Sequence, residues 1–149
     1  MRSRNRRPQR VGRHQRHWTP LYTVTVLALN SGMKRKEIRT LKWKNLDLAD
    51  RLIRVGESKT EAGKGRPIPL TQPAWATLEM WASRFPKRNA DDFVFPASEN
   101  GRVDPHRPIA NWRTAWRRAC RSANLVGLRF HDLRHNAATK LLDRERRLP

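Results

Sequence analysis

Apolar residues recur at the three-to-four-residue spacing of one helix face in several stretches of this chain. The stretches that this pattern predicts as helices are residues 19–29, 34–41, 73–81, 109–121 and 131–142. Thr19 and Pro20 give the first helix a start signal, since threonine caps free N–H groups and proline suits the first helical turn. Asn30-Ser31-Gly32 then ends that helix.

Three short runs have extended rather than helical patterning. Leu52–Val55 and Pro67–Leu70 flank a polar, glycine-containing loop, residues 56–65, so they are expected to pair as a hairpin. The prolines of the second run suit an edge strand, because proline has no N–H to donate to a neighbour. Phe93–Phe95 is a brief extended segment, and residues 99–107 are expected to form a turn-rich loop. The whole pattern predicts a mainly α chain with a small antiparallel β-sheet, an α+β fold.

The charge of the chain indicates a polyanionic partner. Its 149 residues carry a formal net charge of +20. Residues 1–17 hold seven arginines and no acid, and they are predicted to be a basic disordered tail. Residues 18–149 still carry +13 and are long enough for one domain with its own core. The folded part is therefore expected to be basic without the tail.

Membrane, secreted and metal-binding classes receive little support. The longest apolar run, residues 21–29, is too short to span a bilayer. The N-terminus lacks the apolar segment of a secretory signal; its arginines also fit an organelle transit peptide, but no amphipathic helix is evident there. Cys120 is the only cysteine, and no His/Cys spacing is typical of a metal site. No metal and no cofactor are expected.

The most informative residues are His131 and Arg134, which lie about one helical turn apart on the same face. Such a pair can hold one phosphate, with the guanidinium forking onto two oxygens and the imidazole exchanging a proton beside them. The alternative is an ordinary surface histidine and arginine at a helix start.

Two further basic elements lie upstream. Lys34 and Arg35 follow Gly32 at a loop-to-helix junction, and helix N-termini attract phosphate. Lys59 lies in the predicted hairpin loop, from which a flexible lysine can protonate a leaving oxygen. Taken alone, each element is also typical of a solvated charged surface.

A fourth basic element is the helix predicted over residues 109–121. Arg113, Arg117 and Arg121 share one face of it. Trp112 and Trp116 lie on the other face, and they are predicted to be core residues rather than platforms for stacked bases.

Four stretches resemble the catalytic domain of tyrosine site-specific recombinases, the phage integrase family, and they occur in the order found in that family. Residues 27–48 resemble its first box and residues 55–70 its β-hairpin with a catalytic lysine. Residues 91–96 resemble a recurring strand, and residues 127–142 resemble its second box. The resemblance covers about residues 19–142 and implies an integrase-like catalytic domain.

The resemblance implies cleavage and rejoining of double-stranded DNA. In this family a tyrosine attacks a DNA phosphate and becomes covalently linked to it. Two arginines neutralise the non-bridging oxygens and a lysine protonates the departing 5′ oxygen, with no metal required. The family also implies other recombinase subunits as partners, and a cytoplasmic, nucleoid-associated location.

Residue by residue, the resemblance makes Arg134 the second clamp arginine, His131 the box histidine and Lys59 the general acid. Glu37 matches a position that braces the site. Further residues expected to bind DNA phosphate are Arg35, Lys64, Arg66, Arg113, Arg117 and His135.

Two departures from the family pattern bear on activity. Lys34 stands where the first clamp arginine is expected; lysine keeps the charge but lacks the planar fork. Arg35 is adjacent, but neighbouring helical residues point about 100° apart. The nucleophilic tyrosine is expected after the last helix, whereas the only tyrosine is Tyr22, which is predicted to be a packing residue.

The chain is therefore interpreted as a C-terminally incomplete catalytic domain that is inactive alone. One alternative is a catalytically dead DNA-binding remnant or regulator of recombination sites. The other is an unrelated basic RNA-binding protein, which would prefer RNA and would not depend on Arg134.

Duplex DNA binding is expected to depend strongly on salt. If about six phosphates are neutralised, the logarithm of affinity should fall against the logarithm of salt concentration with a slope of roughly −5. Deleting residues 1–17 should reduce the slope without abolishing binding, because the remainder carries +13. A salt titration of binding affinity measures both slopes, and a slope near zero would contradict the prediction.

Overall fold

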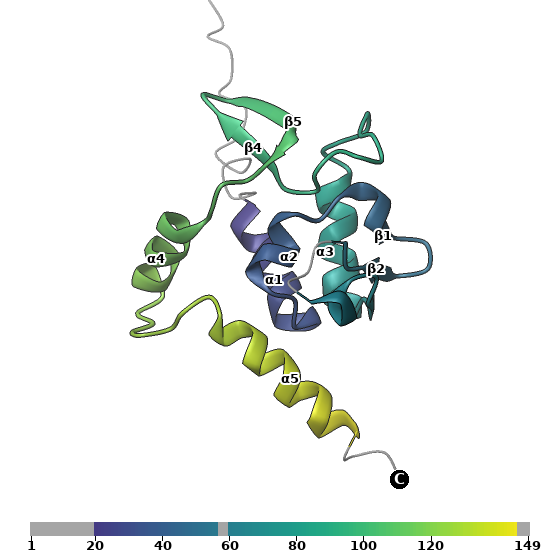
Figure 1. Cartoon of the computed structure of the whole chain (residues 1–149). Helices are drawn as coiled ribbons and strands as arrows, with labels where there is room; N and C mark the ends of the chain where they lie inside the picture. Colours follow the sequence, from purple (N-terminus) through teal and green to yellow (C-terminus); the bar gives the residue numbers. More distant parts are fainter. Residues whose placement is uncertain (1–19, 57–59, 146–149) are drawn as a thin grey trace, which may run out of the picture.

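The computed structural model describes residues 20–56 and 60–145 (Figure 1). The tail predicted for residues 1–17 and the predicted general acid Lys59 lie outside the described residues. The helices are α1 (Pro20–Ser31), α2 (Arg35–Arg39), α3 (Gln72–Ala82), α4 (Arg113–Ser122) and α5 (Asp132–Glu145). The strands are β1 (Leu46–Asp47), β2 (Leu52–Arg54), β3 (Pro67–Pro69), β4 (Pro96–Glu99) and β5 (Arg102–Pro108), and they form small antiparallel sheets. The predicted α+β fold is confirmed.

The first hairpin forms where the sequence predicts it. β2 pairs with β3 in a register that sets Ile53 opposite Ile68, and both side chains are buried. β1 joins the other side of β2, an addition that the pattern did not predict. β3 is therefore an edge strand, the place where its two prolines are tolerated.

The second hairpin contradicts the prediction for this region. The sequence predicts a loop over residues 99–107, but these residues form the end of β4, a two-residue turn and most of β5, which pairs with β4. Phe93 forms an isolated antiparallel bridge with Lys42, and the ladder between β4 and β5 starts at Pro96. Asn100 and Gly101 both have positive φ, 51° and 77°. A two-residue hairpin turn with positive φ at both positions has a backbone twist that matches the twist of the flanking strands, and Asn-Gly favours this turn. The Asn-Gly dipeptide is therefore the sequence signal for the second hairpin.

Helix α1 is the centre of the packing. It contacts α3 and α5, as Figure 1 shows. Val24, Leu27 and Ala28 on its predicted apolar face are buried. Other fully buried residues around them are Met33, Ile38, Ile53, Leu78, Val94 and Phe95. Among the described residues, no helix has both the length and the apolarity that crossing a membrane requires.

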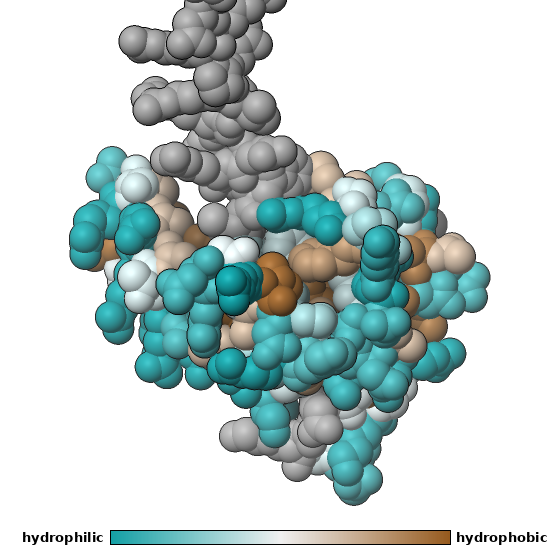
Figure 2. Space-filling model, turned by 90° about the horizontal axis from the view of Figure 1, so that it is seen from above, coloured by the Kyte–Doolittle hydropathy of each residue, from teal (hydrophilic) through white to brown (hydrophobic). Residues whose placement is uncertain are grey.

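Helix α4 stands apart from the main body (Figure 1). Aromatic side chains connect it to the body. Trp112 is 4% exposed and belongs to the core as predicted, whereas Trp116 packs against the core but is only half-buried. The Phe130 ring meets both indoles edge-on, with ring centroids 5.1 Å and 5.3 Å apart. The helix begins at Arg113 rather than Ile109, because the Ile109 N–H donates to Phe95 O and holds the entering chain extended. Hydrophilic side chains cover most of the face seen in Figure 2.

Two tryptophans provide a test of where the stability resides. Trp81 is 3% exposed and its Nε1 donates to Val94 O at 2.7 Å. Trp81→Phe should lower the free energy of unfolding by about 2 kcal/mol, because it leaves a small cavity and a buried carbonyl without its donor. Trp75 is half-buried and donates to Leu48 O at 2.9 Å, so Trp75→Phe should cost about half as much. Urea denaturation measures both, and equal losses would contradict the prediction.

Candidate nucleic-acid interface

One hydrogen bond fastens α5 to the end of α1. Arg134 Nε donates to Gly32 O at 2.9 Å. Gly32 has a φ of +65°, the left-handed conformation that ends α1 and turns its carbonyl toward α5. Because this bond uses Nε, the N–H groups of both Nη atoms keep their capacity to bind anion oxygens.

A buried carboxylate holds the start of α2. The Glu37 side chain is 3% exposed, and its Oε2 accepts from the Lys34 N–H at 2.8 Å and from Arg66 Nη2 at 3.3 Å. The first contact closes the first turn of α2, as a capping-box glutamate does. The second joins the residue before β3 to the same point. Glu37 thus fixes the direction in which Lys34 and Arg35 leave the backbone.

The basic residues of α2 lie across a groove from the start of α5. This groove, here called the polar compartment, has a volume of about 590 Å³. Its charged lining residues are Lys34, Arg35, Lys36, Glu37, Arg39, His131 and Arg134. Ala110, Asn111 and Trp112 complete it, and Arg39 Nη1 donates to Ala110 O at 3.3 Å. Five full positive charges meet one buried acid here, so the compartment favours an anion.

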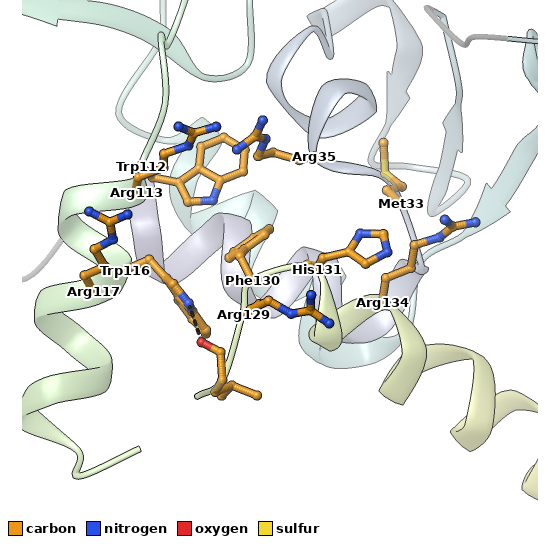
Figure 3. A pocket seen from close by; sticks show the side chains of 12 residues that line it. Met33, Arg35, Trp112, Arg113, Trp116, Arg117, Arg129, Phe130, His131 and Arg134 are labelled. Atoms are coloured by element: carbon orange, nitrogen blue, oxygen red, sulfur yellow. Dashed lines mark hydrogen bonds between the residues drawn. The ribbon is translucent and has the colours of Figure 1, made fainter. Parts of the chain in front are cut away.

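A second hollow adjoins the first. This aromatic compartment has a volume of about 500 Å³, and Figure 3 shows its lining side chains. It shares Arg35, Trp112, His131 and Arg134 with the polar compartment. Its other members are Ala28, Met33, Trp116, Leu128 and Phe130, with Arg113, Arg117 and Arg129. The two compartments therefore form one groove between α2, α4 and the start of α5.

Asp132 fixes the approach to α5. Its carboxylate accepts from the Arg129 N–H at 2.8 Å and from Arg129 Nη2 at 3.3 Å. The hydrogen bond from the Arg129 N–H holds the pKa of Asp132 below its ordinary value, so this residue stays ionised at neutral pH. His131 is exposed, and its ring meets that of His135 edge-on with centroids 5.1 Å apart. The imidazole of His131 is therefore accessible from solvent beside Arg134.

The family of the chain follows from comparison with known proteins. A model of the phage integrase family matches residues 11–147. This chain belongs to the phage integrase family. The shufflon-specific DNA recombinase of Escherichia coli is 29% identical over 123 residues, which cover 83% of this chain and 28% of that protein. The tyrosine recombinase XerC of Bifidobacterium longum is 30% identical over 131 residues, which cover 80% of this chain and 35% of that protein.

Solved structures confirm the integrase catalytic-domain fold. The XerA recombinase has a TM-score of 0.63 and 23% identity, over 82% of this chain and 42% of that one. The Tn1549 transposon integrase in complex with circular intermediate DNA has a TM-score of 0.60 and 19% identity, over 83% of this chain and 45% of that one. This integrase-family chain thus spans about a third of these curated relatives and less than half of these two structures.

Most of the predicted site residues of this integrase-family chain come together. Six of them line the groove: Lys34, Arg35, Arg113, Arg117, His131 and Arg134. Three do not line either compartment. Lys64 forms a salt bridge with Glu61 at 2.7 Å, Arg66 contacts Glu37, and His135 reaches the groove only through His131.

Sequence reasoning missed Lys36, Arg39 and Arg129, which also line the groove. Each lies within five residues of a predicted site residue, so counting every basic residue of the two boxes was the signal available. Tyr22 is a correction: its side chain is 53% exposed on α1 rather than packed. It lies ten residues before Gly32, about 15 Å along a helix that rises 1.5 Å per residue, and it does not line either compartment.

Arg134 has a structural duty that Arg35 lacks. Arg134→Ala should lower the free energy of unfolding by about 1–2 kcal/mol, because Gly32 O loses a charged donor at the α1–α5 contact. Arg35→Ala removes an exposed side chain from the same groove and should cost less than about 0.5 kcal/mol. Urea denaturation of the two variants measures the difference. Equal costs would mean that the Arg134–Gly32 bond does not stabilise the fold.

Proposed function

We propose that this chain binds double-stranded DNA through the groove and acts in site-specific recombination as part of a tyrosine-recombinase catalytic domain. The observation that carries the proposal is the convergence of Lys34 and Arg35 with His131 and Arg134 on one groove. These two pairs are about a hundred residues apart in the sequence and enter from different helices. A phosphodiester fits a site that combines a guanidinium, further cations and an accessible imidazole.

The proposed chemistry is stabilisation of a phosphate under attack. The Nη groups of Arg134 and the cations of α2 bind the non-bridging oxygens, where negative charge gathers as the new bond forms. His131 exchanges a proton beside them. Lys59 is proposed to protonate the departing 5′ oxygen. The Arg66–Glu37 contact supports this role, since it holds the root of the hairpin that carries Lys59 against the start of α2.

Either Arg35 or Lys34 could take the role of the first arginine that binds the phosphate oxygens. Arg35 lines both compartments, whereas Lys34 lines only the polar one. Only arginine presents the planar fork that matches two phosphate oxygens. We therefore assign the fork to Arg35 and an additional point charge to Lys34.

A second candidate function is DNA binding without catalysis. The exposed Tyr22, the only tyrosine of the chain, favours it. Tyr22 lies about 15 Å along α1 from Gly32. This distance is too long for its hydroxyl to attack a phosphate held by Arg134. In this reading the chain occupies recombination sites, and a nucleophile comes from another polypeptide segment or does not come at all.

A nicked suicide duplex distinguishes the two functions. The 149-residue chain should bind the duplex and form no covalent adduct. Fusion to the C-terminal segment of a tyrosine recombinase relative, which supplies the family's tyrosine, should give an adduct that survives denaturing electrophoresis. In that fusion, Arg134→Ala should slow adduct formation by about 10²–10³-fold, the loss expected for one transition-state contact, while salt-dependent DNA binding changes little.

Two reciprocal substitutions in the fusion test the clamp. If Arg35 supplies the fork, Arg35→Lys should slow adduct formation about tenfold or more, and Lys34→Arg should change it little. If Arg35→Lys changes adduct formation little and Lys34→Arg accelerates it, position 34 supplies the clamp instead. Lys87→Ala is the matched control, because Lys87 is exposed and lines neither compartment. An adduct that forms with the chain alone and disappears in Tyr22→Phe would overturn the proposal.

A further inference from the structure

The aromatic compartment has a composition that phosphate binding does not require. Met33, Leu128, Trp116 and Phe130 give it an apolar interior. The polar compartment is lined by fewer apolar residues, Ala110 and Trp112, and it shares Trp112 with the aromatic compartment. A site built only for the DNA backbone needs cations and hydrogen-bond donors, so the additional aromatic rings of this compartment call for a different ligand group.

Aromatic surface remains open inside this compartment. Trp116 and Phe130 are both half-buried, although each packs against the core. Their rings are nearly perpendicular, at 87°, and Trp116 is oriented by a hydrogen bond from its Nε1 to Leu128 O at 3.2 Å. The two rings are therefore fixed before any ligand arrives, which lowers the entropic cost of stacking something against them.

A buried donor without a partner lies in the shared wall. Trp112 Nε1 is enclosed and has no hydrogen-bond partner among the described residues. Figure 3 shows the indole nitrogen on the edge of the ring that faces Phe130. Buried N–H groups are nearly always paired in proteins. Because Nε1 has no exposed surface, an acceptor on a ligand would reach it only after the shared wall shifts.

The rim selects the charge of the ligand. Arg113, Arg117 and Arg129 stand around the apolar interior, together with Arg35 and Arg134. An apolar peptide or a lipid tail gains nothing from five guanidinium groups. A nucleotide offers a flat aromatic base with acceptor atoms and carries its negative charge on the attached phosphate. The volume of about 500 Å³ lies within the usual range for pockets of small ligands.

We propose that the aromatic compartment binds one unpaired DNA base, with its face stacked on Trp116 and its edge against Phe130, next to the phosphate held in the polar compartment. The inference rests on the proposed function, since a sugar joins each base to its phosphate and the two compartments share a wall. It adds a preference: DNA that contains an unpaired base binds more tightly than an intact duplex.

Three DNA probes of otherwise identical sequence test the preference at one ionic strength. They are an intact duplex, the same duplex with a single-base bulge, and the same duplex with an abasic bulge. The abasic bulge keeps the flexibility and the extra phosphate but removes the base. Fluorescence anisotropy with the 149-residue chain should show the base-bearing bulge binding about tenfold more tightly than the abasic one, within the range for a base stacked on an aromatic side chain.

The outcomes separate the inference from the proposed function. Equal affinity for the two bulges, with the intact duplex still bound, overturns the aromatic-compartment inference and leaves the proposed function standing. Binding to none of the three probes overturns the proposed function.

Variants identify the rings responsible. Trp116→Leu should abolish the preference, whereas Trp116→Phe should keep most of it, because it retains an aromatic face. Trp75→Leu is the matched control: Trp75 is also half-buried with its Nε1 bonded to a backbone carbonyl, but it lies outside the groove. Phe130→Leu keeps the apolar volume and provides a second test if Trp116→Leu does not fold. A preference that survives the folded Leu variant would overturn the inference.

Discussion

The site depends on the contact between the end of α1 and the start of α5, where Arg134 Nε donates to Gly32 O. This bond joins two segments about a hundred residues apart. It also decides what Arg134 can do, because a guanidinium held through Nε presents its two Nη groups in a fixed direction. Gly32 makes the contact possible: its positive φ ends α1, starts the path to α2 and turns its carbonyl toward α5 in one residue. Position, orientation and chain direction are thus set at a single point.

The second constraint is the cost of gathering cations. Five lysine and arginine side chains line the polar compartment, and like charges at this density repel one another. Glu37 offsets part of this repulsion from a buried position, where its charge is screened less than a surface carboxylate would be. Its bonds to the Lys34 N–H and to Arg66 also give it a mechanical role, since they tie the first hairpin to α2. The remaining excess of positive charge is what a polyanion would neutralise.

Helix α4 explains why the groove has two unlike halves. The helix stands away from the body and is connected through Trp112, Trp116 and Phe130. The aromatic cluster that holds the helix also forms the interior of the aromatic compartment, so one set of side chains serves packing and shapes the site. Arg113 and Arg117 on α4 then line the rim. An amphipathic helix with aromatic residues on one face and arginines on the other gives an aromatic interior with an arginine rim when it docks by its aromatic face alone.

The sequence by itself determined the helices, the first hairpin, the family and most of the cationic residues of the site, because periodicity, turn chemistry and the order of the boxes are local properties of the chain. It also contains the Asn100-Gly101 turn signal of the second hairpin, although the prolines in β5 are not typical of a strand. Only the tertiary structure decided which basic residues share a groove. Arg129 enters it, while Lys64 and Arg66 are directed to Glu61 and Glu37. It also decided that Tyr22 is exposed on α1. The physical reason is that a charge on a helix face or a loop has the same local signature wherever it points, and its partner is fixed by packing between segments distant in the sequence.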